Sequence, residues 1–169
     1  VLVFKDTFTG PQQIFKAAWS PDSKWLTYTK QGRSHMRAVY VYSLETGESH
    51  QVTDGMSDAI SPVFDRGGKY LCLLSSTDSG PEMDSAMTSF SRAVTSSVYL
   101  VVLRKDLPSP LAPESDEEKE ATAEAKAESD VGKRPAAEVP AVRIDFENIG
   151  QRIVALPLPQ RNYLELHPG

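Results

Sequence analysis

The chain has 169 residues, of which 24% are charged, and a net charge of −5 at pH 7. This acidic balance argues against binding to the nucleic-acid backbone, and no run of apolar residues is long enough to span a membrane. A single cysteine, Cys72, leaves no internal disulfide, so we expect this residue to pack in the core.

Four antiparallel strands are predicted between residues 15 and 53. An apolar entry strand is followed by a turn, residues 20–23, in which Pro21 fixes its own φ and Asp22 can accept hydrogen bonds from the backbone ahead. The other three strands are expected at residues 25–29, 38–42 and 49–53. Gly47 suits the left-handed position of the hairpin that joins the last two.

Part of this pattern returns 45 residues later, where VFDRGGKYLCLLS at residues 63–75 matches AWSPDSKWLTYTK at residues 18–30. The alignment places Phe64 over Trp19 and Tyr70 over Trp25. The third strand recurs as SVYLVVL at residues 97–103, at an offset of 59, so the second copy carries an insertion. Repeats of a four-stranded unit at this period are typical of a β-propeller, in which each blade buries its faces against neighbouring blades. The predicted fold class is therefore all-β, a partial propeller.

The chain divides into four parts on this basis. Residues 1–14 would end a preceding blade and connect it to the next, residues 15–53 a complete blade, residues 54–157 a second blade, and residues 158–169 the start of another. Residues 142–146 are expected to be the outer strand of the second blade, and residues 163–166 the next inner strand. We expect the chain to be a fragment of a longer protein.

Two insertions interrupt the second blade. Residues 76–96 place apolar side chains at helical spacing, so a short helix or coil on one end of the propeller is predicted. It would cover apolar surface or narrow the channel mouth. Residues 109–140 are rich in Ala, Glu, Lys and Pro, and nine acidic residues stand against four basic ones from Glu114 to Glu138. This composition predicts a disordered acidic loop, either a solvated insertion or a tether for a basic partner.

The combined motifs resemble a known family. WSPDSKWLTYTK and the Thr-Gly-Glu hairpin of VYSLETGESHQVTDG look like TolB-type propeller repeats. The later succession, SVYLVVLRKDLPSPLAPESDEE, then an acidic insertion and IDFENIGQRIVALPLPQRNY, is similar to the second propeller of tricorn-type serine peptidases. Ser23 and the pair Arg66-Gly67 depart from the repeat consensus in the two turns. The resemblance implies a parent serine peptidase acting on oligopeptides, with its catalytic residues in C-terminal domains.

The sequence shows no motif of a catalytic or metal-binding site. The three histidines, His35, His50 and His167, lack the spacing of zinc ligands, and Asp78, Glu82 and Asp84 lack that of a calcium loop. Ser49 and His50 are neighbours on a predicted strand and so face opposite sides, which rules out a nucleophile and base pair. The basic loop, formed by Lys30, Arg33, His35 and Arg37, is expected to be solvated. We expect no catalytic, cofactor-binding or metal residue, and substrate-binding residues are not identified.

Two functions remain open at this point. One is a non-catalytic propeller segment of a tricorn-like peptidase that gates or guides oligopeptides to a distant active site. The other is a TolB-like protein-binding scaffold without enzyme activity. The expected partners are oligopeptides through the parent enzyme, other domains of the same chain and, from the resemblance, further copies in a homo-oligomer; no nucleic acid is expected. A cytoplasmic location is favoured and a periplasmic one stays open.

Overall fold

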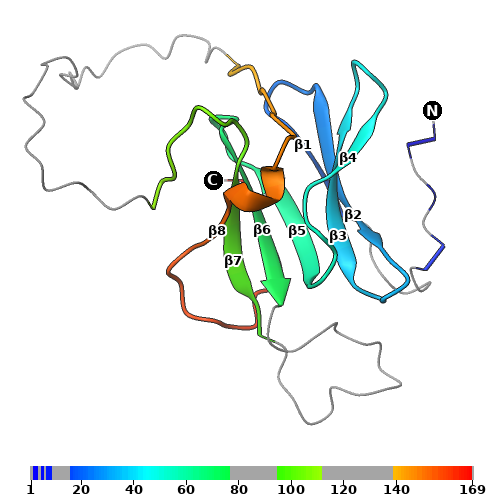
Figure 1. Ribbon diagram of the computed structural model, residues 1–169, viewed down its shortest axis with the longest axis vertical. Coiled ribbons are helices and arrows are strands. Elements are labelled where there is room, and N and C mark those ends of the chain that lie inside the picture. Colours follow the sequence, from blue (N-terminus) through cyan, green and yellow to red (C-terminus); the bar gives the residue numbers. More distant parts are fainter. Residues whose placement is uncertain are drawn as a thin grey trace, which may run out of the picture.

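The computed structural model describes residues 2, 3, 5, 7, 8, 16–76, 95–111 and 139–168. Its strands form two four-stranded antiparallel sheets, in the orders β1-β2-β3-β4 and β5-β6-β7-β8. In each sheet, the strand order follows the chain order, and Figure 1 shows the two sheets side by side. This arrangement confirms the all-β class predicted from the repeat.

The strands of the first sheet lie where the sequence predicts them, within one or two residues. They are β1 (Ala17–Trp19), β2 (Trp25–Gln31), β3 (Arg37–Ser43) and β4 (Ser49–Gln51). Gly47 adopts a φ of 73° in the hairpin between β3 and β4, as its position in the sequence indicates. The β-branched and aromatic run in β3 is largely buried because this strand lies between two others and packs on the second sheet.

The second sheet repeats the first at the level of individual pairs. It consists of β5 (Asp58–Phe64), β6 (Tyr70–Ser76), β7 (Ser97–Val102) and β8 (Ile153–Ala155), with a short 3₁₀ helix, η1 (Ile149–Arg152), before the last strand. Trp19 pairs with Leu26 in the first sheet, and Phe64 pairs with Leu71 in the second. Each residue of the second pair lies 45 positions after its counterpart in the first pair, so Trp19 and Phe64 are equivalent, as predicted.

The two turns that lead into β2 and β6 are also equivalent. The Ser20 hydroxyl accepts a hydrogen bond from the Trp25 amide at 3.0 Å, and an Asp65 carboxylate oxygen accepts one from the Tyr70 amide at 2.7 Å. In the first turn, Asp22 also accepts the Lys24 amide at 3.2 Å, as the sequence predicts. Each turn therefore uses a side-chain oxygen to close the entry to the following strand.

One strand prediction is wrong. Residues 142–146 are not in a strand; the outer strand of the second sheet is β8, in which Ile153 pairs with Val101. Residues 142–146 alternate apolar and polar side chains, as a half-buried strand does, whereas residues 153–155 are all apolar, so the pattern favours the wrong segment. Residues 142–146 instead lie across the junction of the two sheets, where Val142 and Ile144 are buried.

The core lies at the junction between the sheets, because β5 lies against β1, β2 and β3. Val39 and Val41 from the first sheet pack with residues of the second sheet and of the segment that crosses the junction. The buried members of this core are Val39, Val41, Val52, Ala59, Phe64, Leu71, Leu73, Val101, Leu103, Val142, Ile144 and Ile149. Burial of such side chains contributes about 1.5–3 kcal/mol each, so the junction is the main source of stability.

The remaining predictions concern segments at the margins of the described residues. The helix expected within residues 76–96 and the disordered loop expected within residues 109–140 fall almost entirely outside the described ranges. Residues 163–166 are not assigned to a strand, but the Leu166 amide donates to the Ser61 hydroxyl at 2.9 Å. Lys16, just before β1, forms an ion pair with Glu165 at 3.0 Å. Together, the two contacts place this segment beside β1 and β5, the first strand of each sheet.

Candidate functional site

The junction between the two sheets carries the most extensive polar contacts between elements distant in sequence, and it is the candidate site. At one end of the junction, Arg37 at the start of β3 meets Asp58 at the start of β5. The Arg37 amide and Nε donate to the same Asp58 oxygen at 2.8 and 2.9 Å, and Nη2 contacts the other oxygen. The Asp58 side chain is 5% exposed and that of Arg37 is 23% exposed. This pair is a buried bidentate ion pair that joins the sheets.

At the other end, residues 142–149, called the crossing segment below, pass from one sheet to the other. The Val142 amide donates to Asp22 Oδ2 at 2.8 Å, and the Trp25 indole nitrogen donates to the Val142 carbonyl at 3.2 Å. The Phe146 ring stacks on His50, with centroids 3.9 Å apart, and lies 5.8 Å from the ring of Trp25. Each of these contacts of the crossing segment uses a side chain from the first sheet or from the turn that leads into β2.

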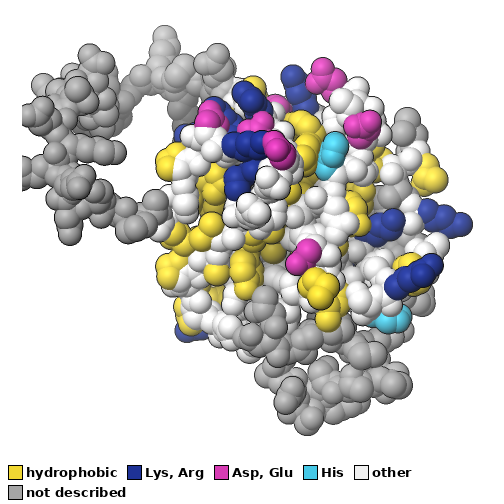
Figure 2. All heavy atoms as spheres, viewed as in Figure 1, with side chains coloured by type: hydrophobic (Ala, Val, Ile, Leu, Met, Phe, Trp, Pro, Cys, Tyr) yellow, Lys and Arg dark blue, Asp and Glu magenta, His cyan; other side chains and the backbone are white. Residues whose placement is uncertain are grey.

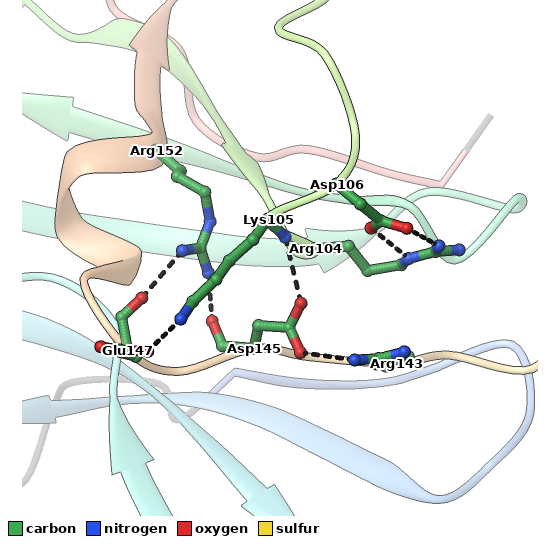
Figure 3. Close-up of polar contacts among 7 residues, drawn as sticks. All are labelled: Arg104, Lys105, Asp106, Arg143, Asp145, Glu147 and Arg152. Carbon is green, nitrogen blue, oxygen red and sulfur yellow. Dashed lines mark hydrogen bonds and ion pairs between the residues drawn. The ribbon is translucent and has the colours of Figure 1, made fainter.

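Its attachment to the second sheet uses the backbone. The Asp145 amide donates to the Leu103 carbonyl at 2.9 Å, and the Lys105 amide donates to an Asp145 carboxylate oxygen at 3.1 Å. Arg152 donates through Nε to the Val102 carbonyl at 3.0 Å and through Nη1 to the Glu147 carbonyl at 2.8 Å. Figure 3 shows the Arg152 guanidinium directed at the backbone oxygens of Asp145 and Glu147.

Charged side chains surround this attachment and neutralise one another. Lys105 pairs with Glu147, and Arg143 pairs with Asp145 at 3.4 Å. The hydrogen bond from the Lys105 amide is the largest influence on Asp145 and holds its pKa below the ordinary value, against the opposing effect of desolvation. The Lys105 ammonium likewise lowers the pKa of Glu147. Figure 2 shows basic and acidic side chains interleaved over this end of the molecule.

Asp22 links the first turn to the crossing segment. One of its oxygens accepts the Ser20 hydroxyl at 2.6 Å and the Lys24 amide, and the other accepts the Val142 amide. Partial burial raises the pKa of Asp22, but the hydrogen bonds from Ser20, Val142 and Lys24 outweigh it and lower the pKa below the ordinary value. The ionised carboxylate is the form that holds this arrangement together.

Some of the residues weighed in the sequence analysis make structural contacts. Ser49 accepts a hydrogen bond from the Tyr28 hydroxyl at 3.0 Å, while His50 stacks on Phe146, so the neighbours are directed to different partners. Within the basic loop, Arg37 is committed to Asp58, whereas Arg33 and His35 are exposed. Burial raises the pKa of the Cys72 thiol on β6. Asp78, Glu82 and Asp84 lie outside the described residues.

Two kinds of feature are absent from the part of the chain that the structure describes. No group of three or more His, Cys, Asp or Glu side chains in that part of the chain could hold a metal ion. No helix there is long and apolar enough to cross a membrane. His167, weighed as a possible ligand, lies 3.8 Å from Glu165 at the surface.

The crossing segment is the feature that the sequence analysis missed. Trp25 and Phe146 are 121 residues apart, and Asp22 and Val142 are 120 residues apart, so local periodicity gives no signal for either contact. The chemistry of the junction is hydrogen bonding, ion pairing and aromatic packing. Such a set of groups positions polypeptide chain, and it places no nucleophile beside a base.

Comparisons with known proteins agree with this architecture. The model of the tricorn protease second beta propeller domain matches residues 10–169. Two proteins of Streptomyces coelicolor are similar: "Putative tricorn protease homolog 2", 29% identical over 155 residues, and "Tricorn protease homolog 1", 26% identical over 148 residues. The matches cover 89% and 88% of this chain but only 13% of each relative.

A solved structure shows the same fold. The crystal structure of the tricorn protease matches with a TM-score of 0.64 and 21% identity, over 99% of this chain and 15% of that one. The two four-stranded sheets thus correspond to propeller blades in a much longer relative.

Proposed function

The chain belongs to the family of the tricorn protease second β-propeller domain, and on that premise we propose that it is a non-catalytic segment of a tricorn-like serine peptidase. In this proposal, the propeller gates or guides oligopeptides towards an active site in C-terminal domains beyond these 169 residues. The parent enzyme would be a homo-oligomer. The chain spans about an eighth of the length of the curated relatives that it matches, so the activity belongs to the longer protein.

The observation that carries the proposal is the arrangement of the two sheets. The first strand of each, β1 and β5, lie against each other, and residues 163–166 lie beside both. In a propeller, the first strand of each blade lines the central channel. This part of the chain would therefore contribute two adjacent sectors of a channel wall, and residues 163–166 would begin the third.

The contacts of Ser49 and His50, the serine and histidine considered above as a nucleophile and base, support a non-catalytic role. Ser49 is hydrogen-bonded to Tyr28, and His50 is stacked on Phe146, so each has a structural partner. A nucleophile requires a base within hydrogen-bond reach and a preorganised oxyanion site. We assign both requirements to other domains of the parent.

Peptide cleavage by the full-length protein tests the proposal. Met56 is 79% exposed and stands just before β5, a strand that this proposal places on the channel wall, whereas Leu44 is 46% exposed in the hairpin between the last two strands of its sheet, β3 and β4. If the propeller guides substrate, Met56→Glu should raise or lower KM for a long oligopeptide several-fold and leave turnover of a minimal peptide substrate unchanged. Leu44→Glu is the matched control and should change neither.

Two outcomes would contradict the proposal. If Met56→Glu changes the kinetics of the long and minimal peptides equally, the effect is on the active site and not on access. If the full-length protein hydrolyses no peptide of any length, a protein-binding scaffold without enzyme activity is the better assignment.

A further inference from the structure

The two ends of the sheet junction are held in chemically different ways. At one end, Arg37 and Asp58 form a bidentate pair whose carboxylate is almost fully buried. Separating this pair would leave an uncompensated charge away from water, which is strongly unfavourable. At the other end, the polar contacts of the crossing segment with the first sheet involve one carboxylate oxygen and one indole nitrogen, beside one aromatic stack, and the Val142 and Ile144 side chains join the junction core.

The second end can separate without leaving a buried charge. Asp22 keeps its hydrogen bonds from Ser20 and Lys24 on the other carboxylate oxygen, because those partners belong to its own turn. The freed oxygen lies in a partly exposed side chain that water can reach. His50 is also partly exposed, so neither partner requires the crossing segment for its solvation.

The crossing segment should remain bonded to the second sheet when it separates from the first. Its backbone is bonded to Leu103, its Asp145 carboxylate accepts the Lys105 amide, and the chain continues directly into η1 and β8. Arg152 holds the turn at residues 145–147 through three donor contacts to backbone carbonyls. Figure 3 shows the contacts among Lys105, Asp145, Glu147 and Arg152, none of which belongs to the first sheet.

We propose that the crossing segment is a releasable latch, and that the blade junction opens at this end while the Arg37–Asp58 pair remains closed as the pivot. The released state separates Val142 and Phe146 from Asp22, Trp25 and His50 and keeps both sheets intact. The junction is then a built-in hinge, with a buried ion pair at one end and, at the other, a latch that can separate without leaving a buried charge. This inference does not depend on the proposed peptidase function.

Hydrogen exchange measured by mass spectrometry on the full-length protein tests the latch, because local openings expose amides independently of global unfolding. Asp22→Ala removes the acceptor of the Val142 amide. A hydrogen bond to a charged group is worth enough that the exchange of peptides covering residues 139–149 should speed up by about tenfold or more. Peptides covering β3 and β5 should keep the wild-type rate.

Three further variants make the result decisive. Phe146→Leu weakens the latch without touching the turn, so it should give the same pattern as Asp22→Ala, which a loss confined to the Asp22 turn would not produce. Asp54→Ala is the matched control, because Asp54 caps the Met56 amide at 2.9 Å in another turn and has no contact with the crossing segment. Asp58→Ala removes the pivot and should accelerate exchange in β3, β5 and the crossing segment together.

Two results would overturn the inference. One is a crossing segment that exchanges in wild-type protein at the same rate as β3 and β5, since the junction would then open as a single unit. The other is a variant pair, Asp22→Ala and Phe146→Leu, in which exchange within residues 139–149 does not change, since these contacts would then not hold the segment.

Discussion

Ser23 and Gly68 occupy the same left-handed position in two turns that lie 45 residues apart, with φ values of 58° and 65°. Glycine adopts this conformation freely, whereas a residue with a side chain is strained by about 1–2 kcal/mol. The first turn tolerates the strain because the Ser23 amide donates to the Ser20 carbonyl at 2.9 Å and the turn is closed by Ser20 and Asp22.

Replacing Ser23 with glycine should therefore stabilise the chain. Relief of strain exceeds the extra entropy of glycine in the unfolded state, so the free energy of unfolding should rise by about 0.5–1 kcal/mol. Urea unfolding of the 169-residue chain at high dilution, followed by tryptophan fluorescence, measures it. Arg66→Gly, in the second turn and without a positive φ, should have the opposite sign; equal effects at both positions would contradict the strain argument.

The reverse substitution, Gly68→Ala, should be strongly destabilising. A Cβ at Gly68 would lie 2.7 Å from Cγ2 of Val142 and would also occupy the left-handed region. The two effects together predict a loss of about 2–4 kcal/mol. Gly150→Ala, which meets no atom within 4 Å, is the control and should change little.

A second substitution separates the two causes. Adding Val142→Ala to Gly68→Ala should recover the part of the stability that the steric clash removes. The part lost to the left-handed backbone conformation should remain lost. If the double variant is no more stable than the sum of the single effects, the close contact with Val142 is not what makes glycine necessary at this turn.

These turns illustrate how much of the structure was accessible from the sequence. The repeat located seven of the eight described strands and both turns, because each depends on residues close together in the chain. The outer strand of the second sheet was misplaced because residues 142–146 alternate apolar and polar side chains as a strand does, whereas the actual strand, residues 153–155, is uniformly apolar. The choice between them depends on Gly68, Trp25 and Asp22, which leave a place for Val142 at the junction.

Local sequence patterns could not predict the candidate site either, because its contacts join residues that are far apart in the chain. Arg37 was interpreted as one cation of a solvated loop, and only the packing of β3 on β5 shows that it pairs with Asp58. His50 was interpreted as hairpin surface, and its stacking on Phe146 spans 96 residues of sequence. Contacts of this separation are specified by how the two sheets pack.

The Arg37–Asp58 pair should dominate the polar contribution to stability. Asp58→Ala leaves the partly buried Arg37 guanidinium without its carboxylate, which should cost about 3–5 kcal/mol of unfolding free energy. Asp106→Ala breaks the exposed pair with Arg104 and should be indistinguishable from wild type in the same urea titration. Similar losses in the two variants would show that the Arg37–Asp58 pair is not distinguished by its burial.

Docking of the crossing segment should depend on pH through Asp22. Because hydrogen bonds lower its pKa in the folded state, the unfolded state binds a proton more readily, and stability rises with pH across this interval. The contribution is complete above the ordinary value of 3.8 and is lost as the pH falls through the lowered folded-state pKa. Trp25 fluorescence in a Trp19→Phe background should report the loss, because its indole contacts the Val142 carbonyl.

Other carboxylates with lowered pKa values, including Asp145 and Glu147, titrate in the same range, so the comparison with Asp22→Asn isolates the effect. The difference in stability between the wild-type and variant chains should be largest near neutral pH and should shrink below pH 3.8. A difference that is constant over the whole acid range would mean that ionised Asp22 does not contribute through its charge.

Trp19 and Phe64 are equivalent by register, yet Trp19 is 57% exposed and Phe64 only 3%. Phe64 belongs to the core at the junction, which the first sheet covers with Val39 and Val41. By the repeat, Trp19 lies on the face that a preceding blade would cover in a complete propeller, and an exposed apolar face of this kind promotes association. The isolated 169-residue chain should therefore self-associate.

Size-exclusion chromatography with light scattering over a range of concentrations measures the association. Trp19→Ser should shift the isolated chain towards monomer, whereas Leu44→Ser, an exposed apolar residue in the β3–β4 hairpin, should not. In the full-length protein, the same Trp19→Ser substitution should lower stability, because the side chain is then buried between blades and its loss leaves a cavity. A wild-type segment that remains monomeric and melts sharply would contradict this prediction, since the Trp19 face would then need no neighbouring blade.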